Sequence, residues 1–294
     1  MAISQNGIIY YSDVLDTLDF YNIPRRTPKD ITSYWQNGTL WNRINGTNGY
    51  QIYEDIHVGD YIDMGRTVTC PNSYNNTVGS QYVTIASCGG FYGKGDSNEY
   101  IVNYNHLIMI PGKGFGGTQH FGRYKMNDSS TTTGAYKNSK MNKNTIGSVV
   151  STVSVTSGAT INQQLYYIFG NHLKTYESFL SNSVDTTGYN RRGKGGGCSD
   201  GRSWTPIQAR LMGEIEVYGS IVWSSSGHDT GDGLRQIDLF RHNREAINNG
   251  KTAYWLKDVA SATEFCRCNY SGTADCYGAG ESGYGVRPCF ILAS

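Results

Sequence analysis

The last forty residues of the chain join two kinds of sequence that differ sharply in what they can bury. Between Cys266 and Tyr284 the chain uses almost only Cys, Arg, Asn, Tyr, Ser, Gly, Thr, Ala and Asp, with Glu281 as the exception. We expect apolar flanking residues to supply the burial that stabilises the fold, because a polar stretch can then vary without unfolding the domain. The flanking residues expected in the core are Trp255, Leu256, Val259, Phe265, Phe290 and Leu292, with Arg287 hydrogen-bonding or pairing across it.

The residue types of this stretch are also related through the genetic code. The asparagine codon AAY gives Tyr, Ser, Asp, Gly, Cys, Thr, Arg or Ala when only its adenines change, whereas Glu281 needs a different parent codon. One interpretation is a segment that is diversified at adenines in its gene. The other is an ordinary polar surface loop that is rich in Gly and Tyr.

Both flanks of the stretch resemble a known family. Residues 255–262 (WLKDVASA) and 285–290 (GVRPCF) are similar to the borders of the variable segment in variable proteins of diversity-generating retroelements. The likeness is to tail-associated proteins of phages that infect gut Firmicutes, of the major tropism determinant type, and it covers residues 56–294. Shorter motifs recur there in the same order, at residues 58–61 (VGDY), 105–107 (NHL), 126–128 (MND), 131–134 (TTTG), 169–173 (FGNHL) and 219–223 (GSIVW).

The resemblance carries expectations about fold and function. In that family an error-prone reverse transcriptase rewrites adenines near the 3′ end of the gene, and the product has a C-type lectin fold. The resemblance therefore implies an α+β, C-type lectin-like domain over residues 56–294, with a variable segment at about 264–289. It implies a phage tail-tip protein that binds a bacterial surface receptor, protein or glycan, and that contacts other tail proteins. It also implies a homotrimer, synthesised in the host cytoplasm and carried in the virion.

The expected ligand-binding residues lie in the variable segment. Tyrosine offers rigid contact area and Ser or Asn offer adaptable hydrogen bonds, so such residues suit adaptable binding surfaces. All of the predicted residues except Glu264 and Cys276 are expected to face solvent and to cluster on one surface. No cofactor and no metal ion are expected. The predicted residues are Glu264, Arg267, Asn269, Tyr270, Ser271, Thr273, Asp275, Cys276, Tyr277, Glu281, Ser282 and Tyr284.

Charge and hydropathy argue against nucleic-acid and membrane partners. The 294-residue chain has a net charge of +1, and its basic cluster at residues 191–194 (RRGK) lies in a Gly-rich stretch that does not match a P-loop. Nucleic-acid binding usually needs a clustered basic face. The N-terminus does not read as a secretory signal. No segment approaches the roughly 20 apolar residues that a membrane helix needs, so no membrane insertion is expected.

The cysteines do not form a zinc pattern. Seven occur, at positions 70, 88, 198, 266, 268, 276 and 289, and their spacing does not pair two Cys-x-x-Cys motifs. A reducing cytosol also disfavours disulfides. We interpret Cys266, Cys268 and Cys276 as products of diversification.

Enzyme chemistry receives little support from the sequence. The chain has no H-E-x-x-H pair, and the sugar-binding motifs of calcium-dependent lectins are missing. His228, Asp229 and Asp232 are interpreted as a solvated turn rather than as acid–base groups or calcium ligands. C-type lectin folds also include the formylglycine-generating enzymes, which would require Cys266 and Cys268 to hold copper in a stretch that looks randomised.

Residues 1–55 lie outside the resemblance. Ile8, Ile9, Tyr10, Trp35 and Trp41 stand in a segment that is too short for a core of its own. One interpretation is an arm for attachment or oligomerisation, which packs on a neighbouring subunit or on a larger particle. The other is an extension that packs on its own domain.

The local patterns predict an α+β chain. Strands are expected at residues 61–64, 82–86, 100–102 and 106–111, where β-branched and aromatic residues stand between turn signals. Helical spacing of apolar residues predicts helices at about 138–153, 159–172 and 205–218. A short helical turn is also expected at 13–18. In the 205–218 helix, Thr205 would cap the N-terminus and Pro206 would take the first position.

Three hypotheses about function follow. The first is a receptor-binding protein that displays a diversified surface. The second is a structural tail or baseplate decoration protein without a diversified site. The third is an enzyme of the formylglycine-generating type, which the doubtful cysteine pair disfavours, so we expect a protein that is not an enzyme.

Overall fold

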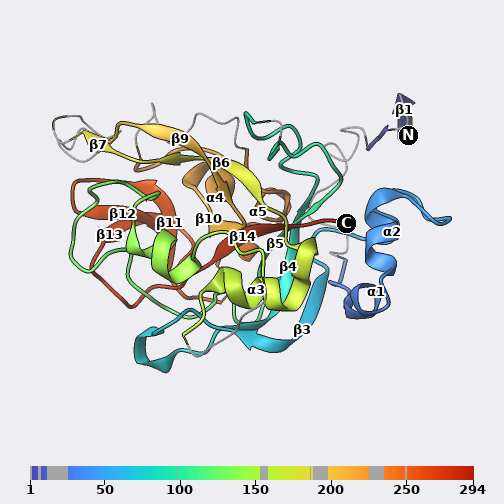
Figure 1. Ribbon diagram of the computed structural model, residues 1–294, viewed down its shortest axis with the longest axis horizontal. Helices are drawn as coiled ribbons and strands as arrows, with labels where there is room; N and C mark the ends of the chain where they lie inside the picture. The colour runs from blue at the N-terminus through green and yellow to red at the C-terminus, as the bar shows by residue number, and fades with distance from the viewer. Residues whose placement is uncertain are drawn as a thin grey trace.

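The computed structural model describes residues 2–5, 8–11, 26–97, 99–152, 158–185, 187, 198–224, 235–248 and 250–294. The centre of the molecule is a five-stranded sheet in which every pair of neighbouring strands is antiparallel (Figure 1). The strands stand in the order β10 (Ala209–Leu211), β14 (Pro288–Leu292), β5 (Leu107–Pro111), β4 (Ser80–Cys88) and β3 (Tyr61–Val68).

Smaller antiparallel sheets surround this centre. Part of the expected variable segment and the flank that precedes it form a three-stranded sheet of β11 (Tyr254–Val259), β12 (Glu264–Cys268) and β13 (Ala274–Gly278). Three further pairs are β6 (Tyr176–Ser181) with β9 (Arg202–Ile207), β7 (Val184–Asp185) with β8 (Cys198–Ser199), and β1 (Ala2–Gln5) with β2 (Ile8–Tyr11).

The helices are few and short. They are α1 (Thr32–Gln36), α2 (Thr39–Asn45), α3 (Ile161–Phe169), α4 (Glu214–Tyr218) and α5 (Asp238–His242), with single turns η2 (Tyr74–Asn76), η3 (Met141–Ile146), η4 (Gly170–His172) and η5 (Arg244–Ile247). A mixture of helices with mostly antiparallel sheets agrees with the expected α+β class. Within the described residues, no helix combines the length and the apolar character that a membrane crossing requires.

Of the three longer helices predicted from the sequence, one forms as predicted. The helix expected at 159–172 is α3 followed by η4, and Thr160 caps it in a box with Gln163. The helix expected at 138–153 is reduced to the π-helical turn η3, because Asn, Thr and then Gly147 have low helix propensity.

The helix expected at 205–218 is wrong over most of its length. Its first part forms β9 and β10, and only Glu214–Tyr218 is helical. Pairing with β6 outweighs the helical spacing, so Thr205 is no cap. In the described chain β9 pairs with β6 alone, and an edge strand tolerates Pro206, which has no N–H.

The strand predictions do better. The runs at 61–64 and 82–86 lie inside β3 and β4, and the buried strand that ends at Pro111 is β5. Residues 100–102 form no strand, since they stand in a turn where the amides of Tyr100 and Ile101 donate to the carbonyl of Ser97. The helical turn expected at 13–18 lies outside the described residues.

The described part of the N-terminal segment packs on its own chain. Trp35 in α1 contacts the ring of Phe169, with centroids 5.3 Å apart, and Trp41 in α2 stacks on His172 at 3.7 Å. Ile31, Leu40 and Ile44 are fully buried. Trp35 and Trp41 are therefore half-buried against other parts of the same chain. The side chains of Ile8, Ile9 and Tyr10 lie outside the description.

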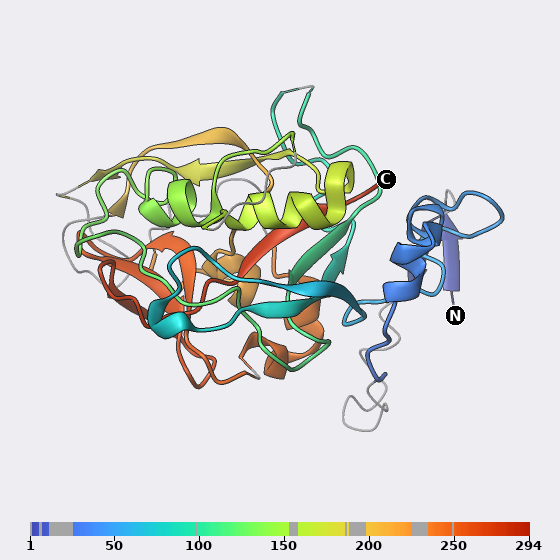
Figure 2. The same cartoon turned by 60° about the horizontal axis from the view of Figure 1, so that its bottom comes forward.

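The helices α1 and α2 and the sheet β11–β12–β13 lie at opposite ends of the molecule. In both views α1 and α2 lie at one end of the long axis, and the sheet β11–β12–β13 lies at the other (Figures 1 and 2). The C-terminus itself returns to the α1–α2 end, where the carbonyl of Ala293 lies 2.9 Å from Nδ1 of His172. Strand β14 thus connects the sheet β11–β12–β13 to the central sheet, in which β14 lies between β10 and β5.

Buried charges connect α4 to both sheets. Arg210 of β10 donates to both carboxylate oxygens of Glu216, at 2.7 and 2.6 Å, and both side chains are almost fully buried. The Glu214 carboxylate accepts the backbone N–H groups of Val222, Trp223 and Ser224. Burial beside Asp258 raises the pKa of Glu214. These contacts fix the chain on both sides of α4, so the segment that follows this helix has a defined position.

Candidate ligand-binding surface

The C-terminal border of the expected variable segment is hydrogen-bonded on both sides. Towards residues 121–124, Tyr124 N–H donates to the Tyr284 carbonyl at 3.0 Å and Val286 N–H donates to the Gly122 carbonyl at 2.9 Å. Towards β11, Trp255 N–H donates to the Gly285 carbonyl at 3.0 Å. The backbone of residues 284–286 is therefore fixed whatever the preceding side chains are.

Gly285 is required by the closeness of this packing. A Cβ atom at this position would lie 3.1 Å from Cβ of His120 and 3.3 Å from Cβ of Tyr254. Any larger residue would push apart the two segments between which the chain passes. The glycine thus has a packing reason that no local pattern reveals.

The N-terminal border is fixed by a loop from the middle of the chain. Thr132 donates its N–H to the Ala262 carbonyl at 3.1 Å and its hydroxyl to the Ser261 carbonyl at 2.8 Å. Asn127 N–H donates to the Ala279 carbonyl at 2.9 Å, and Ala279 N–H donates to the Thr263 carbonyl at 2.9 Å. Two motifs that carried the resemblance, at 126–128 and 131–134, therefore lie directly against the segment.

The expected core residues of the frame are buried. Trp255 donates its indole N–H to the Tyr124 carbonyl at 2.8 Å. Arg287 is 1% exposed and donates to the carbonyls of Ile247 and Ala246, at 2.7 and 3.1 Å. Its role across the core is confirmed. The residues that share full burial are Trp255, Leu256, Val259, Phe265, Phe290 and Leu292.

The twelve predicted ligand-binding residues differ widely in exposure. The exposed ones are Tyr270 (59%), Tyr277 (41%), Ser271, Thr273 and Glu281. The half-buried ones are Glu264, Asn269, Asp275, Cys276 and Ser282. Arg267 and Tyr284 are buried, each 8% exposed, so the expectation that these two side chains face solvent is wrong. They lie beneath the exposed ones, in a cluster that only the tertiary structure brings together.

Arg267 is the centre of this cluster. It lies opposite Asp275 in the β12–β13 register and donates Nε–H and Nη2–H to the same Asp275 oxygen, at 3.0 and 2.6 Å. Its guanidinium carbon lies 4.3 Å from the ring centres of both Tyr277 and Tyr284. Tyr284 in turn meets the ring of Trp255 edge-on at 4.9 Å. The exposed Tyr277 is thus held in place by buried neighbours.

The hairpin turn between β12 and β13 is closed by its own polar side chains. The Asn269 side-chain oxygen accepts Ser271 N–H at 2.9 Å, the Ser271 hydroxyl at 2.7 Å and Thr273 N–H at 3.1 Å. Gly272 takes φ = +83°, where a residue without Cβ is favoured. Tyr270 makes no such contact and is 59% exposed.

The cysteines of strands β12 and β13 are mostly buried. Cys266 and Cys268 are fully buried, and Cys276 is half-buried opposite Cys266 in the register of β12 and β13. Burial raises the pKa of the Cys268 thiol, whereas a reactive cysteine needs a lowered one. Cys266 and Cys268 therefore pack in the core.

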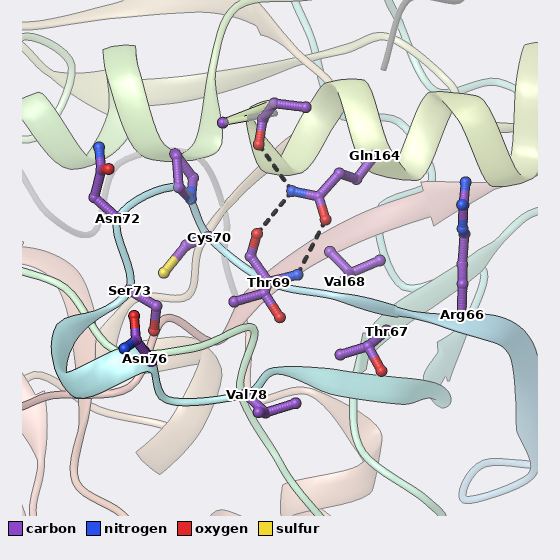
Figure 3. A pocket seen from close by; sticks show the side chains of 13 residues that line it. Arg66, Thr67, Val68, Thr69, Cys70, Asn72, Ser73, Asn76, Val78 and Gln164 are labelled. Atoms are coloured by element: carbon purple, nitrogen blue, oxygen red, sulfur yellow. Dashed lines mark hydrogen bonds between the residues drawn. The ribbon is translucent and has the colours of Figure 1, made fainter. Parts of the chain in front are cut away.

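Hollows on the surface give further candidate sites. A hollow of about 600 Å³ lies between α3 and the chain after β3 (Figure 3). Gln164 crosses it, but its amide is committed to Thr69 and Ala159, donating to both carbonyls at 2.7 and 2.8 Å. Burial raises the pKa of the nearby Cys70 thiol to about 11. The side chain that crosses the hollow is therefore already hydrogen-bonded within the chain.

Sequence reasoning missed a second hollow, beside the β12–β13 turn. It has a volume of about 840 Å³, and residues of the expected variable segment line it together with residues from outside that segment. The missed residues include Arg244 and Lys251. A signal was present, because residues 235–251 carry four basic side chains against two acidic ones.

Other expectations concern groups that the structure does not describe. The basic cluster at 191–194 and the loop with His228, Asp229 and Asp232 lie outside the described residues. In the part of the chain that is described, no three or more His, Cys, Asp or Glu residues gather where they could hold a metal ion. Comparison with protein-family models, curated proteins and solved structures found no match to this chain.

The packing of His120 against the frame predicts a pH dependence of stability. Burial, helped by Arg123 and Arg287, lowers the pKa of His120 to about 4 from a usual 6.5. Between these values the unfolded chain binds more protons than the folded one, so the free energy of unfolding falls as pH drops from 6.5 to 4. The expected loss is about 3 kcal/mol.

Urea unfolding of the protein and of His120→Asn at pH 7 and pH 4.5 measures this loss. An asparagine oxygen can still accept the Gly122 N–H that His120 Nδ1 now accepts at 3.1 Å. The variant should lose less stability on acidification, while buried His106 and the carboxylates contribute equally to both proteins. An equal loss in the two proteins would contradict the assignment.

Proposed function

We propose that this chain is a phage tail-tip protein with a C-type lectin-like fold, which binds a bacterial surface receptor through a retroelement-diversified surface. One observation carries the proposal. The stretch whose residue types are reachable from AAY codons is the stretch whose backbone is fixed by its surroundings, while Tyr270, Ser271, Thr273, Tyr277 and Glu281 remain exposed. A surface of this kind can change its side chains at little cost in stability.

The arrangement of the molecule supports the same proposal. The sheet β11–β12–β13 lies at the end of the long axis opposite α1 and α2 (Figure 2). An attachment to other tail proteins near the N-terminus would leave the exposed tyrosines directed away from the particle. Binding by the exposed side chains also suits their chemistry, since tyrosine contributes contact area at low entropic cost.

The other two functions have weaker support. A structural decoration protein needs an exposed C-terminal loop but no fixed frame beneath it, and it gives no reason for the AAY-reachable composition. An enzyme of the formylglycine-generating type needs an accessible, activated cysteine. Cys266 and Cys268 are fully buried, and burial raises the pKa of Cys268.

The diversification predicts a pattern in the coding DNA. The codons of residues 266–284, except that of Glu281, should end in a pyrimidine. A near-copy of this stretch should lie close to a reverse-transcriptase gene and differ from it mainly where one copy has adenine. The codons of residues 285–292 should be the same in both copies, because the frame must not vary. The informative positions are those of Gly, Ser, Thr, Ala and Arg, whose codons can end in any base. Purine-ending codons at most of these positions, or no such copy, would favour the decoration protein.

Receptor binding predicts a loss of adsorption when the exposed tyrosines are removed. Tyr270→Ala with Tyr277→Ala should reduce binding of the protein to susceptible bacteria at least tenfold, since exposed aromatic residues dominate such interfaces. Binding of the labelled protein to a panel of strains is measured by flow cytometry. Tyr284 is left intact because it is buried.

The matched control is Tyr74→Ala with Tyr92→Ala. These tyrosines are 42% and 65% exposed and lie outside the segment. Both double variants should unfold within about 1 kcal/mol of the parent. Equal adsorption by the two variants would leave the decoration protein as the better explanation.

We further propose that the chain assembles as a homotrimer. Several weak sites on one particle would together give firm adsorption. Mass photometry at micromolar concentration should therefore show a species of three times the 32.5 kDa chain mass. A shortened chain, residues 26–294, keeps the packed α1 and α2 and tests whether the first 25 residues are needed. A full-length protein that remains monomeric would refute the assembly.

A further inference from the structure

The hollow beside the β12–β13 turn has two walls of different origin. One wall is the turn itself, with Ser271, Gly272, Thr273 and Ala274. The second wall belongs to the part of the chain outside the expected variable segment. Its lining residues are Arg244, Glu245, Ile247, Asn248, Lys251, Tyr218, Ser220, Val222 and Gln236. The volume of the hollow, about 840 Å³, is within the range of ligand sites. We refer to the hollow as the turn groove.

The second wall is held rigidly by the frame. The Ile247 carbonyl accepts hydrogen bonds from Arg287 at 2.7 Å and from the Tyr254 hydroxyl at 2.9 Å. Asn248 donates to the Asn269 carbonyl and accepts Thr252 N–H, so it joins the two walls. The groove therefore exists before a ligand binds, which lowers the entropic cost of binding.

The charge of the second wall is positive. Arg244 and Lys251 are exposed, and neither makes an ion pair with another described residue. Glu245 is the acidic side chain among the lining residues of the described chain. Arg235 and Arg241, also exposed, belong to the same stretch of chain but do not line the groove, and Arg241 lies 3.7 Å from a carboxylate oxygen of Asp238. Cations without partners beside a preformed groove favour an anionic ligand.

The remaining lining favours a hydroxyl-rich ligand. Ser220, Gln236, Asn248, Ser271 and Thr273 offer hydroxyl and amide groups, which donate and accept hydrogen bonds. A protein partner would need a pocket for a large apolar anchor, whereas Ile247 is only 6% exposed and Ala274 is small. A single-stranded nucleic acid would need successive aromatic residues for stacking, and Tyr218 is the aromatic residue lining the groove in the described chain.

We infer that the turn groove binds an anionic polysaccharide, with Arg244 and Lys251 attracting its carboxylate, phosphate or sulfate groups. The inference rests on the proposed receptor-binding function and gives its ligand a chemical class. The second wall would provide a common affinity for charged surface polymers. Ser271 and Thr273 on the other wall would then distinguish one polymer from another as these positions change.

The experiment uses full-length protein and three dextrans of equal length. Dextran sulfate and carboxymethyl dextran carry the two kinds of anion, and neutral dextran shares their backbone. Binding is measured by calorimetry at 50 and 300 mM salt. We expect the protein to bind one or both charged dextrans, not the neutral one, and more weakly at high salt.

The decisive variant is Arg244→Gln with Lys251→Gln, which should weaken binding about tenfold. The matched control is Arg66→Gln with Lys143→Gln, which removes one exposed Arg and one exposed Lys elsewhere and should leave binding unchanged. Equal weakening by both pairs would show unspecific attraction and overturn the inference. Tighter binding of polyglutamate or of a DNA oligonucleotide than of either charged dextran would also overturn it.

The outcome is separable from that of the proposed function. Adsorption lost in the Tyr270→Ala, Tyr277→Ala variant, together with charged-dextran binding that is unaffected in the Arg244→Gln, Lys251→Gln variant, would keep receptor binding and reject the groove. Charged-dextran binding that depends on Arg244 and Lys251, with adsorption intact in the tyrosine variant, would keep the groove and reject the proposed display surface.

Discussion

Residues 284–286 pass between two other segments, and their backbone hydrogen bonds hold the sheet β11–β12–β13 against the rest of the chain. Backbone hydrogen bonds join this stretch to residues 121–124 on one side and to β11 on the other. Gly285 allows the approach, since a Cβ atom there would lie 3.1 Å from Cβ of His120. The chain then continues directly into β14 within the central sheet. The sheet β11–β12–β13 and the central sheet therefore share one covalent and hydrogen-bonded connection.

Arg287 extends this connection to the surface. Its buried guanidinium binds the carbonyls of Ala246 and Ile247 and lies over the rings of Phe240 and Tyr254. A buried charge without hydrogen bonds would be very costly, so these contacts are obligatory. They also fix the second wall of the turn groove. One residue of the frame thus links the core to the turn groove.

The residues that stabilise the fold by burial are largely different from the residues that face solvent. The residues that carry burial, such as Trp255, Phe265 and Phe290, lie in the frame. The exposed residues of β13 and the turn, among them Tyr270 and Tyr277, contribute little burial of their own. Arg267 and Tyr284 stand between the two groups, because they are buried yet hold the exposed Tyr277 in position. Substitution at those two positions would therefore affect both the stability of the sheet and the orientation of the surface.

Much of the frame could be predicted from the sequence alone. The apolar residues at its borders specify burial whatever surrounds them, and the α3 helix follows from its apolar spacing and the Thr160 cap. The sequence could not predict the structure of residues 205–218. Their apolar residues have helical spacing, but the pairing of β9 with β6 outweighs it, and of this range Glu214–Tyr218 is helical. Nor could it show that Arg267 and Tyr284 are buried or that Arg244 and Lys251 face the turn. Those facts depend on which segments meet in space, and the partners lie far apart along the chain.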